Sequence, residues 1–460
     1  MYLEDTIVAP ATPPGRGAVA IVRLSGPRAI AIAQKLWHPR RESAQIMPRQ
    51  LRLGEIRDPQ KGKLLDHAMC VIMPGPQSLT GEDIAELHCH GGVYLVRRVV
   101  ALAAAEGARI AKPGEFSRRA FLNGRIDLTE AEAIADLIDA RGEGALHYSL
   151  AHLAGALAAR VRRLREQVIA IRAHLEAEID FSDEELDLPS RQALAADIVT
   201  LNENVAILHQ SFTRGRVIRE GARAAIIGKP NVGKSSILNL LLGTERAIVT
   251  AFPGTTRDVI EESVDLGTWS LVLVDTAGIR ESPEEVERIG IVRARAAAEQ
   301  ADLVIVVFDS SRLLDAEDAA VIGLVHERRG IALLNKQDLP QRAGADDLRN
   351  RGLLLPILNF CAVTGDGLSQ CREALAREIE ELAGGEVTNE VVITRERHRD
   401  ALAHTLEALN LALDGLTRQM PPEIIALDIA LAAESLGSIT GEVSNEDVLD
   451  MIFREFCIGK

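Results

Sequence analysis

The sequence of 460 residues predicts a multidomain protein in which an α/β unit with a parallel sheet is inserted into a helical domain and preceded by a separate α/β unit. Two observations predict this fold class. Apolar runs alternate with helix-length segments over residues 220–385, which is typical of a parallel sheet with crossover helices. Segments with helical spacing of apolar residues lie on both sides of that stretch.

Composition limits the class of protein and its compartment. With 47% hydrophobic and 26% charged residues and a net charge of −15, the chain is globular rather than disordered. Aromatic residues make up only 3%, which disfavours modules that bind single strands by base stacking. Five cysteines without a Cys-x-x-Cys pair disfavour a disulfide framework or a thiolate zinc site. With neither a signal-like start nor a membrane-length apolar run, a cytoplasmic protein with no membrane span is expected.

Four segments are predicted in chain order. Residues 1–118 form the first α/β domain, because β-branched runs such as Val19 to Leu24 alternate with Pro/Gly turns. Residues 119–219 form the first part of the helical domain, and residues 386–460 form its second part. Residues 220–385 form the inserted α/β domain. Its strands are expected at five apolar runs: Ala224–Ile227, Leu271–Val274, Leu303–Phe308, Ile331–Leu334 and Leu355–Phe360.

The segment from Gly228 to Ser235 matches the phosphate-binding pattern G-x-x-x-x-G-K-[ST] between a predicted strand and a predicted helix. Backbone N–H groups of such a loop and the helix N-terminus surround phosphates. Lys234 would reach the β- and γ-phosphates, and Ser235 would supply a magnesium ligand. The remaining nucleotide contacts predicted here are Asn231, Val232, Gly233 and Ser236.

Four later motifs follow in the order that a guanine-nucleotide switch needs. In Gly254-Thr255-Thr256-Arg257-Asp258, the Thr256 hydroxyl can close over magnesium and the γ-phosphate. In Asp275-Thr276-Ala277-Gly278, Asp275 can hold the magnesium shell through water while the Gly278 amide meets the γ-phosphate.

The last two motifs concern the base. In Asn335-Lys336-Gln337-Asp338, the Asp338 carboxylate can accept hydrogen bonds from the N1/N2 edge of guanine, whose donors adenine lacks. Cys361 and Ala362 lie in the loop expected behind the base, where serine is more usual than cysteine; the difference matters little if the contact is a backbone amide. Any one motif could be an ordinary loop, but five in order predict a magnesium-dependent GTPase that binds GTP.

Two catalytic groups found in many switch GTPases have no obvious counterpart. Ile279 follows the Asp275–Gly278 motif where many of them carry a water-orienting glutamine. No residue stands out as an arginine finger, a device worth roughly 10³–10⁵ in rate. Asn231 could offer its amide oxygen to a monovalent cation beside the phosphates, and bracing of the loop is an equally supported role.

These motifs, together with the segment EVERIG at Glu285–Gly290, the opening DTIVA-x-ATPPGRG and the final FCIGK, resemble the MnmE family of tRNA modification GTPases, also called TrmE, over the whole chain. The resemblance implies an N-terminal tetrahydrofolate-binding and dimerisation domain, a helical domain and an inserted P-loop GTPase. It implies a homodimer and a heterotetramer with the FAD-dependent protein MnmG. The pair would add an aminomethyl or carboxymethylaminomethyl group, from ammonium or glycine, to C5 of the wobble uridine of certain tRNAs. The one-carbon unit would come from 5-formyl- or methylene-tetrahydrofolate.

The resemblance also assigns residues. It implies a K⁺ site formed by Asn231, Thr250, Phe252 and Thr255, with hydrolysis triggered when two GTPase domains meet, and Glu287 as the carboxylate that orients water. From the residue alone, Glu287 would be a solvated helix residue. Lys234, Asn231 and Glu287 are the expected catalytic set, and Thr250 and Thr255 are further nucleotide contacts.

For folate, the resemblance implies Arg23, Glu86, Arg125 and Lys460, although family patterns often place lysine where Arg125 stands. Cys457 is expected to be either an ordinary or a functional thiol. The sequence His88-Cys89-His90 puts two histidines on one strand face, and a structural role is favoured over a metal site. A ribosome-assembly GTPase and a free-standing folate-dependent one-carbon transferase are the alternative functions.

Overall fold

The structure is a computed structural model that describes residues 5–40, 47–181, 189–243, 262–274, 289–385, 390–443, 446–454 and 456–460. The chain forms two compact units and passes between them several times. Unit 1 consists of Met1–Ala135, His152–Glu166 and Ala433–Lys460, and unit 2 consists of Asp136–Ala151 and Gln167–Ala432. Each unit contains one β-sheet and parts of the long helices.

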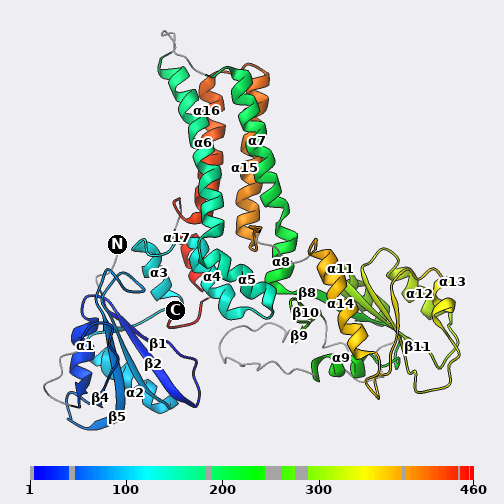
Figure 1. Ribbon diagram of the computed structural model, residues 1–460, viewed down its shortest axis with the longest axis horizontal. Helices are drawn as coiled ribbons and strands as arrows, with labels where there is room; N and C mark the ends of the chain where they lie inside the picture. Colours follow the sequence, from blue (N-terminus) through cyan, green and yellow to red (C-terminus); the bar gives the residue numbers. More distant parts are fainter. Residues whose placement is uncertain are drawn as a thin grey trace. The chain divides into compact units, whose positions relative to one another are not determined.

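Unit 1 is built on a seven-stranded sheet with the order β3-β4-β5-β6-β2-β1-β7. Figure 1 labels β1, β2, β4 and β5 of this sheet together with α1 and α2. The strands are β1 (Ile7–Pro10), β2 (Gly17–Ser25), β3 (Trp37–Pro39), β4 (Arg52–Arg57), β5 (Leu64–Met73), β6 (Ile84–Gly91) and β7 (Arg109–Ile110). Paired strands are antiparallel except for β1 with β7.

The two faces of this sheet pack against different helices. On β2 and β6, the apolar residues Val22 and Leu87 pack in one core with residues of α1 (Ala29–Leu36) and α2 (Val93–Ala105). Because successive side chains of a strand point to opposite faces, Arg23 on β2 and Glu86 on β6 lie on the other face. That face is where α3 (Glu115–Leu122) packs, with Phe116 buried against Ile7 of β1.

Unit 2 contains a six-stranded sheet with the order β13-β12-β11-β8-β10-β9. The strands are β8 (Ala222–Ile227), β9 (Glu262–Asp265), β10 (Ser270–Val274), β11 (Leu303–Asp309), β12 (Gly330–Asn335) and β13 (Ile357–Asn359). The helices around it are α9 (Lys234–Gly243), α11 (Ile289–Gln300), α12 (Ala316–Leu324), α13 (Ala345–Asn350) and α14 (Leu368–Leu382).

Helices cover both faces of this second sheet. Ile305 of β11 packs in one core with residues of α9 and α14, and Val306 packs in a second core with residues of α11 and α12. Central strands buried on both faces have apolar residues at every position, which is why they appear in the sequence as continuous apolar runs.

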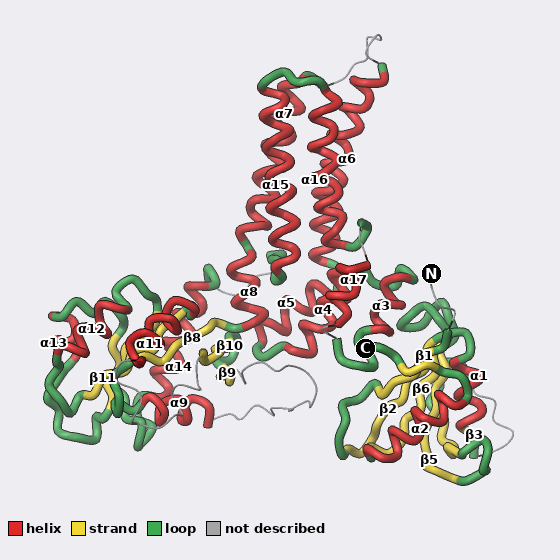
Figure 2. Tube along the Cα trace, turned by 180° about the vertical axis from the view of Figure 1, so that it is seen from behind, coloured by secondary structure: helices red, strands yellow, loops and turns green. Residues whose placement is uncertain are grey.

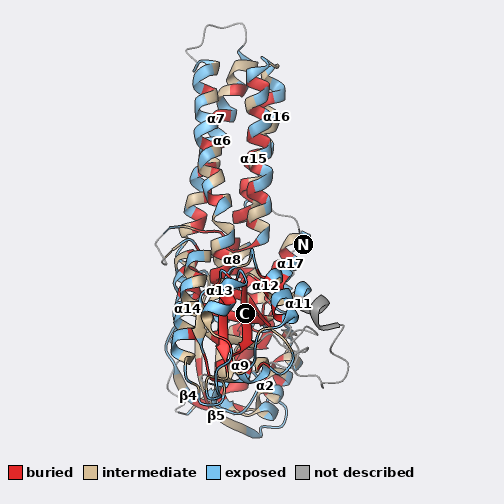
Figure 3. Cartoon of the chain, turned by 90° about the vertical axis from the view of Figure 1, so that its right-hand side faces the viewer, coloured by how far each residue is buried: buried red, intermediate tan, exposed pale blue. Residues whose placement is uncertain are grey.

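The remaining helices precede and follow this sheet in the chain. They are α4 (Leu128–Asp139), α5 (Glu143–Leu153), α6 (Ala156–Asp180), α7 (Arg191–Gln210), α8 (Phe212–Glu220), α15 (Glu396–Thr417), α16 (Pro422–Thr440) and α17 (Glu446–Arg454). α7 packs along α15 (Figure 2). Buried residues recur every three or four positions along α7, because these positions share one helix face. Figure 3 shows that the long helices carry both buried and exposed stretches.

The predicted fold class is confirmed: an α/β sheet of the P-loop type is inserted between helical segments that pack together, and an α/β unit precedes them. β9 is an additional, antiparallel edge strand that the sequence did not predict. The predicted boundary at residue 118 lies inside α3. Among the described helices, none is both long and apolar enough to cross a membrane.

Candidate functional site

The predicted phosphate loop lies between β8 and α9, so the first turn of α9 faces the loop. Gly233 has a φ of 105°, and a Cβ atom there would collide with Nδ2 of Asn335. Glycine is therefore required where two loops meet. Asn231 is exposed and has a φ of 62°, a conformation that asparagine tolerates better than most residues.

Lys234 folds back over this loop. Its Nζ donates hydrogen bonds of 2.7 Å to the carbonyl oxygens of Gly228 and Lys229. Burial lowers the pKa of Lys234 from its ordinary value of 10.5. The ammonium group is thus held where phosphate oxygens, which are stronger acceptors than carbonyls, would meet it. Val232 is buried, while Ser235 and Ser236 are exposed on the first turn of α9.

Lys229, which the sequence did not single out, ties the phosphate loop to α12. Its Nζ lies 2.7 Å from carboxylate oxygens of both Asp315 and Asp318. Burial alone would lower the pKa of Lys229, but hydrogen bonds to the two carboxylates outweigh it and raise the pKa. The hydrogen bond from Lys229 lowers the pKa of Asp315 to about 2. The loop is therefore anchored to α12 through Lys229 and these two carboxylates.

Asn335 joins the predicted base-binding loops to the phosphate loop. Its Nδ2 donates to the Val232 carbonyl oxygen at 2.8 Å, and its Oδ1 accepts from the Ala362 N–H at 3.0 Å. Lys336 has a φ of 66° and pairs with Asp309 at 2.7 Å. The structure thus brings the motifs at 228–235, 335–338 and 361–362 together.

Asp338 and Cys361 meet side by side. The Cys361 thiol donates to Oδ1 of Asp338 at 3.2 Å, while the Cys361 N–H donates to the Asp366 carbonyl oxygen at 2.9 Å. Cys361 therefore contacts Asp338 through its thiol, so its side chain contributes at this position as well as its backbone amide. Sulfur acts here as the donor that a serine hydroxyl would provide.

Several predicted residues lie outside the described part of the chain. They are Thr250, Phe252, Thr255, Thr256, Asp275, Gly278 and Glu287. The structure therefore describes the phosphate loop and the base-binding loops, and these seven assignments stay predictions.

In unit 1, Arg23 and Glu86 are direct cross-strand neighbours. Nε of Arg23 donates to Oε1 of Glu86 at 2.8 Å, and the Arg23 guanidinium carbon lies 5.8 Å from the centre of the Phe116 ring. Both side chains are largely buried, with 18% and 12% of their surface exposed. Glu86 also lies 3.1 Å from Nε2 of His88.

The C-terminal residues dock beside Arg23. The Phe116 N–H donates to the Lys460 carbonyl oxygen at 3.1 Å, and the Gly114 N–H donates to the Cys457 carbonyl oxygen at 3.4 Å. Nη1 of Arg23 donates to the Gly459 carbonyl oxygen at 3.4 Å. Three of the four proposed folate residues, Arg23, Glu86 and Lys460, are thus gathered at one place.

The fourth folate residue and the histidines lie as follows. Arg125 is exposed and lies next to Gly81: a Cβ atom added to Gly81 would be 3.3 Å from Cγ of Arg125. His88 pairs with Glu86, whereas Nδ1 of His90 pairs with Asp66 at 2.7 Å, so the two histidines have different carboxylate partners. Cys457 is exposed, and the other cysteines, Cys70, Cys89, Cys361 and Cys371, are buried.

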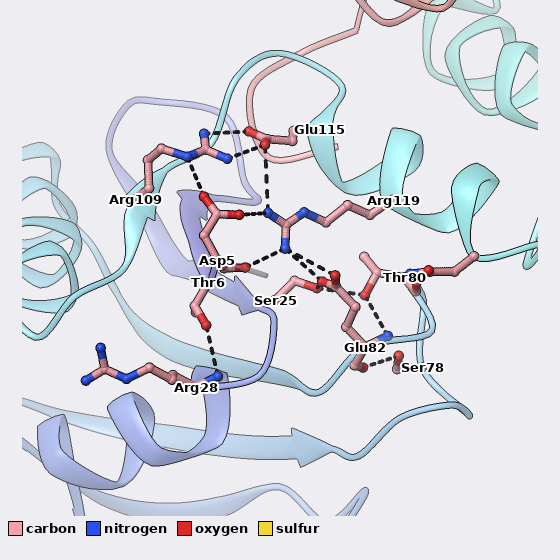
Figure 4. A network of polar contacts seen from close by, with 11 residues as sticks. Asp5, Thr6, Ser25, Arg28, Ser78, Thr80, Glu82, Arg109, Glu115 and Arg119 are labelled. Carbon is pink, nitrogen blue, oxygen red and sulfur yellow. Dashed lines mark hydrogen bonds and ion pairs between the residues drawn. The ribbon is translucent and has the colours of Figure 1, made fainter. Parts of the chain in front are cut away.

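Unit 1 also contains a cluster of charged residues centred on Arg119, which was missed from the sequence (Figure 4). Its members are Asp5, Glu82, Arg109, Glu115 and Arg119. They come from three parts of the chain, at position 5, position 82 and positions 109–119, and no motif marks them.

Comparison with known proteins identifies relatives of the whole chain. A family model described as the MnmE helical domain matches residues 128–457, and one described as GTP-binding protein TrmE N-terminus matches residues 6–125. The chain is 41% identical over 459 residues to a tRNA modification GTPase MnmE of Natranaerobius thermophilus, covering 99% of this chain and 100% of the relative. It is 43% identical over 467 residues to one of Moorella thermoacetica, covering 100% of both.

Among solved structures, the G domain of the T. maritima FeoB iron transporter is similar to 35% of this chain and 98% of that chain, with 26% identity and a TM-score of 0.24. Both family models and the full-length relatives show that the chain belongs to the MnmE family of tRNA modification GTPases.

Proposed function

We propose that the chain is a magnesium-dependent GTPase that acts in tRNA modification. The observation that carries this proposal is the Asn335 link between the phosphate loop and the base-binding loops, in a chain that aligns end to end with tRNA modification GTPases. Deletion of the gene is expected to abolish modification at C5 of the wobble uridine in the affected tRNAs. Unchanged modification would contradict the proposal.

The described residues fit a bound guanosine triphosphate. The Gly233 backbone, the N-terminus of α9 and Lys234 suit phosphates, and Asp338 suits the donor edge of guanine. Magnesium would be held by Ser235, Thr256 and, through water, Asp275, and would neutralise negative charge on the phosphates. The Gly278 amide would contact the γ-phosphate. The purified protein should hydrolyse GTP and not ATP, and only with magnesium present.

Potassium is proposed to replace the arginine finger. The exposed position of Asn231 in the phosphate loop supports a ligand role, and Thr250, Phe252 and Thr255 would complete the site. A face-to-face pair of GTPase domains would activate hydrolysis. The test compares GTP turnover in potassium and sodium chloride at equal ionic strength. Equal turnover would refute the role of potassium.

Glu287 is proposed to orient the attacking water. Glu287→Ala should keep nucleotide affinity and lose turnover, because the carboxylate is needed only in the reacting state. Glu285→Ala, in the same EVERIG segment, is the matched control and should keep turnover. Equal turnover of the two variants would remove the assignment.

Unit 1 is proposed to bind 5-formyl- or methylene-tetrahydrofolate through Arg23, Glu86, Arg125 and Lys460. The pairing of Arg23 with Glu86 beside the C-terminal residues supports this. Basic groups suit the glutamate tail, and the Glu86 carboxylate can accept from the amino edge of the pterin. By calorimetry, Glu86→Gln should weaken binding of 5-formyltetrahydrofolate, whereas the control Glu55→Gln on β4 should not.

Each of the predicted segments would have its own function. Residues 1–118 would bind folate and dimerise, residues 220–385 would hydrolyse GTP, and residues 119–219 with 386–460 would form the helical domain. With an FAD-dependent MnmG partner in a heterotetramer, the protein would add the aminomethyl or carboxymethylaminomethyl group to the wobble uridine. Light scattering of the purified protein, alone and mixed with MnmG, tests both assemblies, and a monomer in both cases would contradict them.

A further inference from the structure

Arg119 on α3 is the most deeply buried member of the charged cluster in unit 1, with 5% of its side chain exposed (Figure 4). Its guanidinium donates to Oδ1 of Asp5 at 2.6 Å, to the Asp5 carbonyl oxygen at 2.8 Å and to Oε2 of Glu82 at 3.0 Å. A buried guanidinium with several acceptors is held in one position, because each lost contact would leave a desolvated charge.

A second arginine closes the cluster. Arg109 donates from Nε to Oδ2 of Asp5 at 2.6 Å and from Nη1 to Oε2 of Glu115 at 3.1 Å. Glu115 is the first residue of α3, and Arg119 lies one turn later. Arg109 of β7 thus fixes the start of α3. Asp5, which lies two positions before β1, fixes the second turn of α3.

The cluster also contacts the strand that carries Arg23. Oε2 of Glu82 accepts from the Ser25 hydroxyl at 2.8 Å, and Ser25 lies 2.7 Å from the Thr80 hydroxyl. Ser25 and Arg23 are two positions apart on β2, so they lie on the same face of the sheet. Through Glu82, Arg119 is therefore connected to the end of β2 next to Arg23.

One turn before Arg119, Phe116 contacts both parts of the proposed folate site. Its ring lies 5.8 Å from the Arg23 guanidinium, and its N–H binds the Lys460 carbonyl oxygen at 3.1 Å. The neighbouring Gly114 N–H binds the Cys457 carbonyl oxygen at 3.4 Å. A shift of α3 would therefore move the partners of Arg23 and of the C-terminal residues together.

We propose that Arg119 is a positioning residue: it holds α3, and through Phe116 and Gly114 it sets the positions of Arg23 and of residues 457–460. The inference rests on the proposed function where it concerns a folate, an anionic ligand with a pterin ring and a glutamate tail. It goes beyond that function by making one buried arginine, which is not itself among the proposed ligand contacts, responsible for their arrangement.

The test uses the full-length protein and Arg119→Lys. Lysine keeps the charge but is a point charge that cannot donate to all three acceptors in the fixed geometry of a guanidinium. We expect affinity for 5-formyltetrahydrofolate to fall roughly 10- to 100-fold, as for other lost supporting contacts. N-ethylmaleimide reports on Cys457, because Cys457 is exposed and the other cysteines are buried. Its rate of modification should rise several-fold in Arg119→Lys, because residues 457–460 would lose their fixed position. GTP turnover, measured in parallel, should stay unchanged.

Arg49→Lys is the matched control, since Arg49 is an exposed arginine of the same unit that donates to the Gln77 carbonyl oxygen at 2.7 Å. If circular dichroism shows that Arg119→Lys is unfolded, Glu82→Gln is tested in its place. An amide keeps the shape of the side chain and an acceptor for Ser25, but it loses the charge that faces Arg119. Folate affinity and Cys457 labelling within twofold of the Arg49→Lys values would overturn the inference. If the wild-type protein binds no folate, the proposed folate role fails, and Cys457 labelling alone still tests the positioning.

Discussion

Asn335 Nδ2 lies 2.8 Å from the Val232 carbonyl oxygen, a hydrogen bond between the end of β12 and the phosphate loop. With 2% of its surface exposed, Asn335 has both ends of its amide paired inside the protein. Buried amides with satisfied donors and acceptors are costly to disturb. The Asn335 side chain therefore joins the loop predicted to hold the phosphates to the loop predicted to hold the base.

Asn335→Asp should weaken GTP binding. The substitution places a carboxylate oxygen against the Val232 carbonyl oxygen and removes the donor between the two loops. An unsatisfied buried group costs about 1–3 kcal/mol, which corresponds to roughly a 5- to 150-fold loss of affinity. Titration with a fluorescent GTP analogue measures the affinity, and Asn350→Asp at the exposed end of α13 is the control. Equal affinity of both variants would contradict the proposed link.

Asp338→Asn should exchange base preference. Its carboxylate would accept from guanine N1 and N2, whereas an amide can donate to the oxygen that xanthine carries in place of the amino group. A hydrogen bond to a charged group contributes about 1.5–3 kcal/mol, so GTP affinity should fall at least tenfold while that for xanthosine triphosphate rises. Cys361→Ser retains a donor to Asp338 and should bind GTP normally. An unchanged GTP preference in Asp338→Asn would disprove the contact.

Acid should destabilise unit 1 through Asp5 and Glu115. Burial alone would raise the pKa of both carboxyls. Hydrogen bonds outweigh this effect: Arg109 donates to both residues and Arg119 donates to Asp5, so the pKa of Asp5 lies below its ordinary value of 3.8 and that of Glu115 below 4.5. Because the unfolded chain then binds more protons in acid, this stabilisation is present above these ordinary values and is lost as pH falls through the lowered folded values.

The measurement is urea unfolding at a series of acidic pH values, followed by the fluorescence of buried Trp37 in a Trp269→Phe background. Glu115→Gln should unfold more readily near neutral pH and should lose less further stability on acidification than the parent. Parallel curves for the two proteins would show that Glu115 does not carry the effect.

Gly459→Ala should release the C-terminal residues. Gly459 has a φ of 98°, and a Cβ there would collide with the Pro10 carbonyl oxygen. Strained left-handed backbone costs about 1–3 kcal/mol even before this clash. Faster alkylation of Cys457 is the expected result. Gly124→Ala, at a φ of 65° with open space around it, is the control, and the idea fails if both variants react alike.

The inserted sheet could be predicted because its central strands are buried on both faces and therefore form continuous apolar runs. β9 escaped prediction because Glu262–Asp265 is short, polar and at the edge of the sheet. The run Leu355–Phe360 was longer than β13, which pairs only over Ile357–Asn359. Strand existence was thus easier to predict than strand ends, which depend on pairing.

Among site residues, Lys234 and Asp338 were predictable because short motifs with a fixed spacing mark them. Arg119 and Lys229 were not, because their carboxylate partners lie as far as 114 and 89 positions away in the chain. Only the fold brings such groups together. In the sequence, Arg119 and Lys229 cannot be told apart from arginines and lysines that lie on the surface. Family resemblance alone suggested that Lys460 belongs near Arg23.

Residues 433–460 complete unit 1, yet they follow the whole of unit 2 in the chain. N-terminal segments emerge first from the ribosome, at roughly 5–20 residues per second. Gly114 and Phe116 must therefore wait roughly 20–70 s for Cys457 and Lys460 to be translated. During that interval the face of the first sheet that carries Arg23 and Glu86 lacks the contacts of Cys457 and Lys460, so unit 1 is completed only after unit 2 has been translated.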